Sequence, residues 1–102
     1  MLKIVVVEPN KVPYVKEIED TLEAKQAIVG GYIETIRLPQ DFYIIVNEEG
    51  KMKGLEPNRM IRGLDMLVGT FFITKSYNRD FATLTDADAE AVIRKFTPLV
   101  IE

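Results

Sequence analysis

The chain has 102 residues, of which 47% are hydrophobic, and no shift in composition along it, so we expect one folded domain over residues 1–102. Its net charge of −3 gives no general attraction to nucleic acid or anionic lipid, and no apolar run approaches the roughly 20 residues that span a bilayer. It contains neither histidine nor cysteine, which excludes histidine-based triads, thiol nucleophiles and imidazole or thiolate metal sites. We therefore expect no cofactor and no membrane contact.

The chain opens with a predicted hairpin. Leu2–Val7 is apolar on both alternating faces, which is typical of a central strand. It meets Glu8 and Pro9 after one strand's length and lacks a small-residue cleavage site, so we expect no signal peptide and a cytoplasmic location. Tyr14–Ile18 contains two charged residues and predicts a partner strand near the sheet edge, which leaves a homodimer through that edge open.

A helix and a second hairpin follow. Asp20 and Glu23 have the spacing of a capping box and predict that the helix begins there, while Gly30 and Gly31 supply the left-handed end that a side chain would resist. Residues 32–38 and 42–46, which are separated by a proline-led turn, predict two paired strands.

The next part of the chain is richer in turns. Residues 48–50 predict a turn with its glycine at positive φ, and residues 51–55 predict a short polar strand. Residues 57–64 predict an irregular link or a short helical turn. Residues 66–73 are the second run that is apolar on both faces, and the glycine within it indicates a bulge or a close backbone approach.

The C-terminal part predicts a loop over residues 76–80 and then a helix. Thr85 and Asp88 have the spacing of a capping box, and the apolar residues that follow recur at helical spacing. Pro98 ends the helix, and residues 99–101 either form a last short strand or simply pack against the core.

The order of these elements is ββαββ(β)βα. It predicts an α+β fold with two helices on a single, mostly antiparallel sheet of about four to six strands. A hairpin, a crossing helix and a central parallel pair would make a β-grasp, or ubiquitin-like, fold. A ferredoxin-like arrangement uses the same elements, so both stay open.

The stretch of residues 47–62 is the first candidate for a functional surface, because it is polar and lies between two apolar strands. An asparagine there could orient a ligand amide while an arginine grips a carboxylate or phosphate with two hydrogen bonds. The candidate binding residues are Asn47, Asn58, Arg59, Arg62 and Tyr32.

A structural interpretation of the same residues stays open. Pro57-Asn58 is a typical turn start, in which the asparagine side chain bonds backbone amides. Arg59 could then pair with Asp65 or Glu34.

Two other functions remain as alternatives. A small carboxylate-dependent enzyme would rely on Glu48, Arg59 and Tyr32 and needs a closed pocket with a carboxyl group of raised pKa. Weak nucleic-acid binding, which the net charge does not favour, would use Lys51, Lys53, Arg59 and Arg62. Three acids near residue 88 could hold a cation, but acids are expected at a helix N-terminus, so no metal site is predicted.

Five motifs that together cover nearly the whole chain carry a resemblance. They are Val6-Val7-Glu8-Pro9, Gly30-Gly31-Tyr32-Ile33-Glu34, Asn47-Glu48-Glu49-Gly50-Lys51, Gly54-Leu55-x-Pro57-Asn58-Arg59 and Val68-Gly69-Thr70-Phe71-Phe72. In this order they resemble a family of small bacterial and phage proteins, domain of unknown function 3846. The family has no established activity. Its association with phages and mobile elements implies an accessory or interaction role.

The leading hypothesis is therefore a non-catalytic binding module of a bacterial or phage accessory system. It would engage a protein partner or a small anionic ligand through the surface of residues 47–62. On this hypothesis, alanine at Asn58 and Arg59 would abolish partner capture and leave the melting temperature nearly unchanged.

Overall fold

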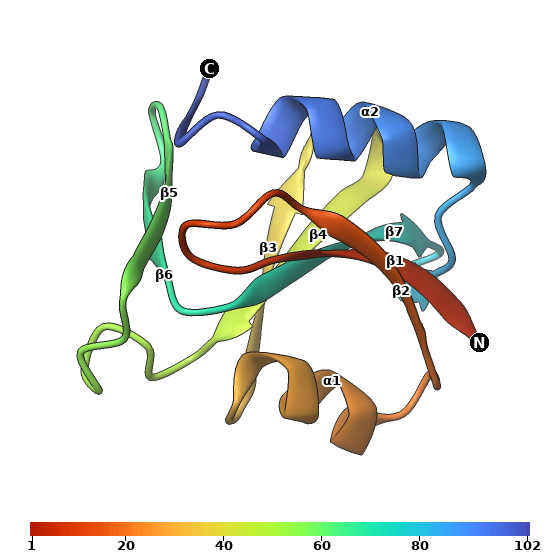
Figure 1. The fold of residues 1–102 in the computed structure, drawn as a ribbon. Helices are drawn as coiled ribbons and strands as arrows, with labels where there is room; N and C mark the ends of the chain where they lie inside the picture. The colour runs from red at the N-terminus through yellow and green to blue at the C-terminus, as the bar shows by residue number, and fades with distance from the viewer.

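The computed structural model describes residues 1–102 as a three-layer α+β fold, with a twisted sheet between two helices and a smaller sheet at one side (Figure 1). The elements in chain order are β1 (Leu2–Val7), β2 (Tyr14–Ile18), α1 (Leu22–Val29), β3 (Ile33–Leu38), the short 3-10 turn η1 (Pro39–Asp41), β4 (Phe42–Asn47), β5 (Pro57–Ile61), β6 (Asp65–Val68), β7 (Phe71–Tyr77), β8 (Asp80–Ala82), α2 (Asp86–Phe96) and β9 (Val100–Ile101). The α+β class, the two helices and the mostly antiparallel sheet are confirmed.

The main sheet has six strands, in the order β2-β1-β7-β4-β3 with β8 beside β7, and every pairing in it is antiparallel. Both predicted hairpins form, β2 lies at an edge as expected, and β1 and β7 are neighbours in the centre. Because β1 and β7 run antiparallel, the central parallel pair of a β-grasp fold is not found and that fold is not confirmed. The single predicted sheet was too simple, since β6, β5 and β9 form a second one.

Alternation along the central strands produces two cores. Val5, Val7 and Phe71 point to the face that α2 and the small sheet cover, whereas Ile4 and Phe72 point to the face that α1 covers. The neighbours Phe71 and Phe72 therefore lie on opposite sides of the sheet, as their alternation predicts. The Phe71 ring meets Phe96 of α2 edge to face, with 6.0 Å between ring centres.

The predicted strand over residues 66–73 is instead two strands. Gly69 lies between them at φ +72°, and a Cβ there would approach the Leu55 side chain to 2.7 Å. The chain turns at this glycine from the small sheet into the main one. The predicted loop over residues 76–80 was also wrong: β7 continues to Tyr77, and a two-residue turn with both residues at positive φ leads into β8.

The segment between β4 and β6 also differs from its prediction. Residues 51–55 form turns rather than a strand, and the glycine at positive φ is Gly54 rather than Gly50. The irregular link expected at residues 57–64 is the strand β5, which pairs with β6 on one side and with the C-terminal β9 on the other. Both strands that pair with β5 follow it in the chain. The residues before β5 therefore give no sign of a partner from which the strand could be predicted.

The helix ends follow the local chemistry. Thr21, not Asp20, caps α1, because its hydroxyl accepts from the Ala24 amide while Asp20 pairs with Lys25. The capping box of α2 is confirmed between Thr85 and Asp88. Neither helix is long and apolar enough to cross a membrane.

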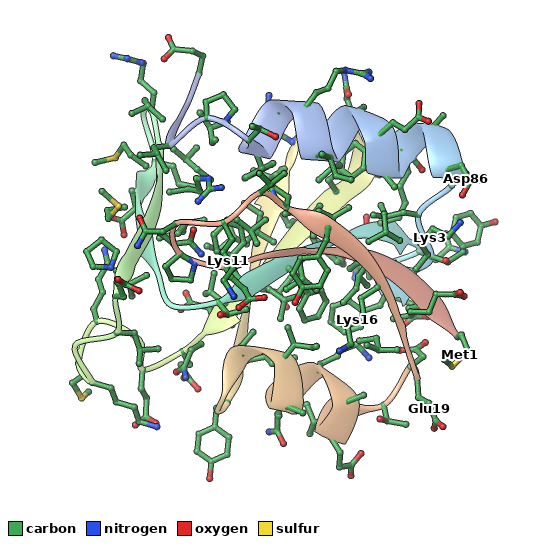
Figure 2. The ribbon with its side chains drawn as sticks, viewed as in Figure 1. Met1, Lys3, Lys11, Lys16, Glu19 and Asp86 are labelled. Atoms are coloured by element: carbon green, nitrogen blue, oxygen red, sulfur yellow. The ribbon has the colours of Figure 1, made fainter.

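Ion pairs tie both ends of α2's first turn to the sheet. Lys3 of β1 bonds Asp86, as Figure 2 shows, and Lys75 of β7 lies 3.4 Å from Asp88. The Thr85 backbone amide and hydroxyl, together with Lys75, hold the pKa of Asp88 below its usual value. The start of α2 is thus stabilised by the ionised form of this carboxyl group.

Asp88→Asn keeps an oxygen that can accept the Thr85 amide but removes the charge, so we expect it to lower the free energy of unfolding at pH 7 by about 1 kcal/mol. A carboxyl group whose pKa is lowered by folding contributes stability above its unfolded pKa, and this stability disappears as the pH falls through the folded pKa. The difference between Asp88→Asn and the unmodified protein should therefore shrink below about pH 4. Urea unfolding from pH 7 to pH 2.5 measures it, with Glu90→Gln on the same helix as control. A difference independent of pH would contradict the assignment.

Candidate functional site

Asn58 and Arg59, the central pair of the sequence hypothesis, lie inside the protein. They are 6% and 1% exposed. The Asn58 side-chain amide donates to the carbonyls of Val7 and Gly69, at 2.9 and 2.8 Å, and its oxygen accepts from Arg59 at 2.8 Å. A side chain used in this way joins β5 to the ends of β1 and β6 and is not available to a ligand.

Arg59 completes the same junction. Its Nε donates to the carbonyl of Phe96 at 2.8 Å, and Nη2 donates to the carbonyl of Lys11 at 2.7 Å. Figure 2 shows Lys11 on the β1–β2 turn, which reaches toward the small sheet. No carboxylate pairs with this arginine, so the expected partners Asp65 and Glu34 are wrong. Burial lowers the pKa of the guanidinium, while the negative C-terminal end of α2 at Phe96 favours its charge.

The other three candidates do not gather around this pair. Asn47 is buried, donates to the carbonyl of Val29 at 3.2 Å and accepts from the Glu49 amide at 2.8 Å, which ties the end of α1 to the end of β4. Tyr32 is 65% exposed and directly precedes β3. Arg62 is exposed and pairs with Glu102 at 2.8 Å. The five residues therefore do not form one site.

The structure also does not bring together the residues expected for nucleic-acid binding or for a carboxylate-dependent enzyme. Among the four basic residues, Lys51 pairs with Asp65, Lys53 with Glu49 and Arg62 with Glu102, and Arg59 is buried. These four residues therefore do not form one patch of unpaired basic side chains. Glu48 lines a shallow hollow of about 330 Å³ beside β6, but neither Arg59 nor Tyr32 lines it. The carboxylate-dependent site is therefore not assembled.

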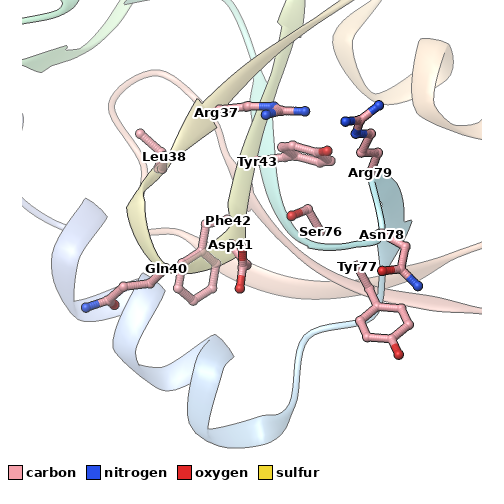
Figure 3. Close-up of a pocket in the computed structure, with 10 residues that line it drawn as sticks. All are labelled: Arg37, Leu38, Gln40, Asp41, Phe42, Tyr43, Ser76, Tyr77, Asn78 and Arg79. Carbon is pink, nitrogen blue, oxygen red and sulfur yellow. The ribbon is translucent and has the colours of Figure 1, made fainter.

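A larger cleft of about 520 Å³ lies between η1 and the β7–β8 turn (Figure 3). Ends of β3, β4 and β7 form its floor. Its lining residues are Arg37, Leu38, Gln40, Asp41, Phe42, Tyr43, Ser76, Tyr77, Asn78 and Arg79. None of these belongs to the surface that the sequence hypothesis selected.

Part of the cleft lies on the face of the sheet that α1 covers, beyond the core under that helix. Eight residues of helix span about 12 Å. The core under α1 reaches Tyr43 and Phe81, whose rings meet edge to face at 5.7 Å. Arg37 is the cross-strand neighbour of Tyr43 and shares its face of the sheet, but it lies outside this core and remains exposed. This exposed end of the face forms part of the floor of the cleft, and Leu38 and Phe42, which pack against the core under α2, complete the lining.

The walls of the cleft have unusual backbone. Among residues other than glycine, five have positive φ, and four of these line the cleft: Gln40, Asp41, Asn78 and Arg79, at +66°, +65°, +50° and +69°. Asn78 and Arg79 have the positive φ that a two-residue hairpin turn requires. In residues other than glycine such conformations cost of order 1 kcal/mol each, and they also occur at ligand clamps and active sites. Two turns with this backbone face each other across the cleft.

The charges in the cleft are not neutralised within the protein. Arg37 and Arg79 take part in none of the ion pairs of the structure. In Figure 3 their guanidinium groups lie at the same end of the cleft as the Tyr43 ring, and Asp41 lies toward the other end, beyond Ser76. The cleft therefore has a cationic end with two free guanidinium groups.

Tyr43 adds a free hydroxyl. The residue is only 6% exposed, yet its hydroxyl bonds no protein group. Because no side-chain polar atom is both fully buried and unpartnered, this hydroxyl keeps contact with solvent. A packed ring thus presents a fixed hydrogen-bond donor where the core meets the cleft.

The sequence did not predict this site because its residues form no recognisable motif along the chain. Residues 39–41 and 76–80 were predicted as a turn and a loop, and residues 32–38, which include Arg37, as a strand. The one signal in the sequence is that both turns carry polar residues and no glycine. It indicates a site only when the strand pairing is known, because β4 pairs with both β3 and β7 and so brings the two turns together.

A family model described as Domain of unknown function (DUF3846) matches residues 2–97. The chain belongs to this family, as the resemblance of its motifs predicts. No curated protein and no solved structure matches the chain.

The buried junction predicts that Arg59→Met destabilises the protein. The substitution keeps much of the side-chain length but leaves the oxygens of Asn58, Phe96 and Lys11 without their donor, so we expect a loss of about 3 kcal/mol in the free energy of unfolding. Urea unfolding measures the loss. Arg62→Met, on an exposed arginine, is the matched control and should change stability by less than about 0.5 kcal/mol. Equal stability of the two variants would show that the junction is not structural.

Proposed function

We propose that this member of the family is a non-catalytic binding module that receives a small anionic ligand in the cleft between η1 and the β7–β8 turn. The observation that carries the proposal is the pair of guanidinium groups, Arg37 and Arg79, that face the cleft without a carboxylate partner. The association of the family with phages and mobile elements makes an accessory system of a bacterium or phage the proposed setting.

Arginine suits this role because its planar fork of donors matches the oxygens of a carboxylate or phosphate. Two such forks from different elements, Arg37 on β3 and Arg79 on the β7–β8 turn, can hold one anion from two directions. Tyr43 adds a donor whose position is fixed by its packing against Phe81. A rigid donor loses little entropy when it binds, which favours a ligand over solvent.

Binding is a better account than catalysis for this cleft. Its one aliphatic hydroxyl, on Ser76, makes no hydrogen bond to a base that could activate it as a nucleophile. The carboxyl groups whose pKa the structure shifts, Glu8, Asp65, Asp86 and Asp88, all lie elsewhere and are all shifted downward. None of them resembles a general acid held protonated near neutral pH.

Contact of a protein partner with residues 47–62 remains a separate prediction. The accessible part of that surface includes Glu48, Lys51, Met52 and Lys53, and both lysines are already paired with carboxylates. An anion would have to displace these carboxylates, which it need not do at Arg37 and Arg79. The cleft is therefore the preferred site for the anionic ligand.

Titration with inorganic phosphate, followed by amide NMR shifts at constant ionic strength, tests the proposal. We expect shifts at residues 37–43 and 76–81, because these residues surround the guanidinium groups. Arg37→Ala combined with Arg79→Ala should weaken phosphate binding at least about tenfold, and Tyr43→Phe about threefold. Arg94→Ala, on an exposed arginine of α2 without an ion pair, is the matched control and should leave the affinity unchanged.

Equal phosphate affinity in the double variant and in the Arg94→Ala control would overturn the proposal. Shifts confined to other parts of the surface would do the same. Thermal unfolding of each variant separates a lost site from a lost fold, since the side chains of Arg37 and Arg79 are exposed and contribute little to packing.

A further inference from the structure

We infer that the ligand of the cleft is a phosphate monoester of a hydroxyl-bearing group, such as a sugar phosphate, with its phosphate at Arg37 and Arg79 and its hydroxyls on Asp41. This inference rests on the proposed function and adds the chemical class of the ligand. It starts from the one group in the cleft that a simple anion does not explain.

That group is the carboxylate of Asp41. It lines the same cleft as the two arginines, but it forms no ion pair with either of them and accepts no hydrogen bond from the protein. Its backbone is held at φ +65° by the turn of η1. A carboxylate in this place repels a bare anion, so a site for inorganic phosphate or sulfate alone would be better without it.

The carboxylate becomes favourable if the ligand brings donors to it. Ionised carboxylates only accept hydrogen bonds, and hydroxyl groups are suitable donors. In Figure 3 Asp41 lies beyond Ser76 from the guanidinium groups. The ligand must therefore carry its negative charge at one end and its donors at the other.

Charge decides between a hydroxyl-bearing phosphate and an amino acid, which would also bring donors to Asp41. A phosphate monoester carries about −1.5 to −2 near neutral pH, which matches two guanidinium groups. The single carboxylate of an amino acid would leave one of the two arginines poorly compensated. The pair Arg37 and Arg79 therefore favours the phosphate.

The residue between the two ends of the cleft fits the middle of such a molecule. In Figure 3 Ser76 lies between the guanidinium groups and Asp41, and its hydroxyl both donates and accepts, as the hydroxyls of a sugar do. The volume of about 520 Å³ lies within the range of pockets for small organic ligands and leaves room beyond the phosphate itself.

The experiment compares ribose 5-phosphate, inorganic phosphate and ribose on the unmodified protein and on Asp41→Asn, by NMR titration at constant ionic strength. We expect ribose 5-phosphate to bind the unmodified protein at least about tenfold more tightly than inorganic phosphate, and ribose not to bind measurably. Asp41→Asn should bind inorganic phosphate more tightly, because a negative charge is lost, and should reduce the preference for ribose 5-phosphate to within about threefold. Asparagine tolerates the positive φ of this position, so the variant should fold.

Asp80→Asn is the matched control, because Asp80 lies next to Arg79 but does not line the cleft, and it should keep the tenfold preference. If neither phosphate compound binds at the cleft, the proposed function itself fails. If both bind with equal affinity to the unmodified protein, or if Asp41→Asn keeps the preference, only the inference about the ligand fails.

Discussion

The structure depends on a buried cation that has no buried anion beside it. Arg59 and Asn58 together bond four backbone carbonyls, those of Val7, Lys11, Gly69 and Phe96. These carbonyls come from the end of β1, the turn after it, the bend between the two sheets and the end of α2. An isolated buried charge is costly, so the arginine is tolerated only because neutral acceptors and the helix dipole surround it.

This junction explains the arrangement of the two sheets. The small sheet contributes Ile61, Leu67 and Ile101 to the core under α2, but it shares no strand pairing with the main sheet. The hydrogen bonds of Asn58 and Arg59 supply the polar part of that contact. Within the polar stretch of residues 47–62, Asn47, Asn58 and Arg59 are therefore structural groups inside the protein, although other residues of the stretch remain exposed.

The sequence predicted the features that depend on neighbouring residues, namely the central strands and most of the helix ends. The two-sided apolar runs predicted β1 and the first residues of β7, although the second run also spans β6. Gly30 ends α1, and Thr85 with Asp88 begins α2. The small sheet was not predicted because β5 pairs with β9 some 40 residues later, and that pairing leaves no local pattern. Asn58 and Arg59 are equally suited to hold a ligand or a backbone carbonyl, so only tertiary structure could distinguish the two roles.

The polar side chains of the cleft differ from those of the buried junction, because they form no hydrogen bond or ion pair that would stabilise the fold. Gln40 and Arg79 are exposed and adopt positive φ, where glycine or asparagine would cost less. Neither side chain forms a hydrogen bond or an ion pair that would offset the cost within the protein. The guanidinium groups of Arg37 and Arg79 at one end of the cleft and the carboxylate of Asp41 toward the other are likewise left without partners. Groups that packing does not require, held in place by strained turns, are what a binding site needs before its ligand arrives.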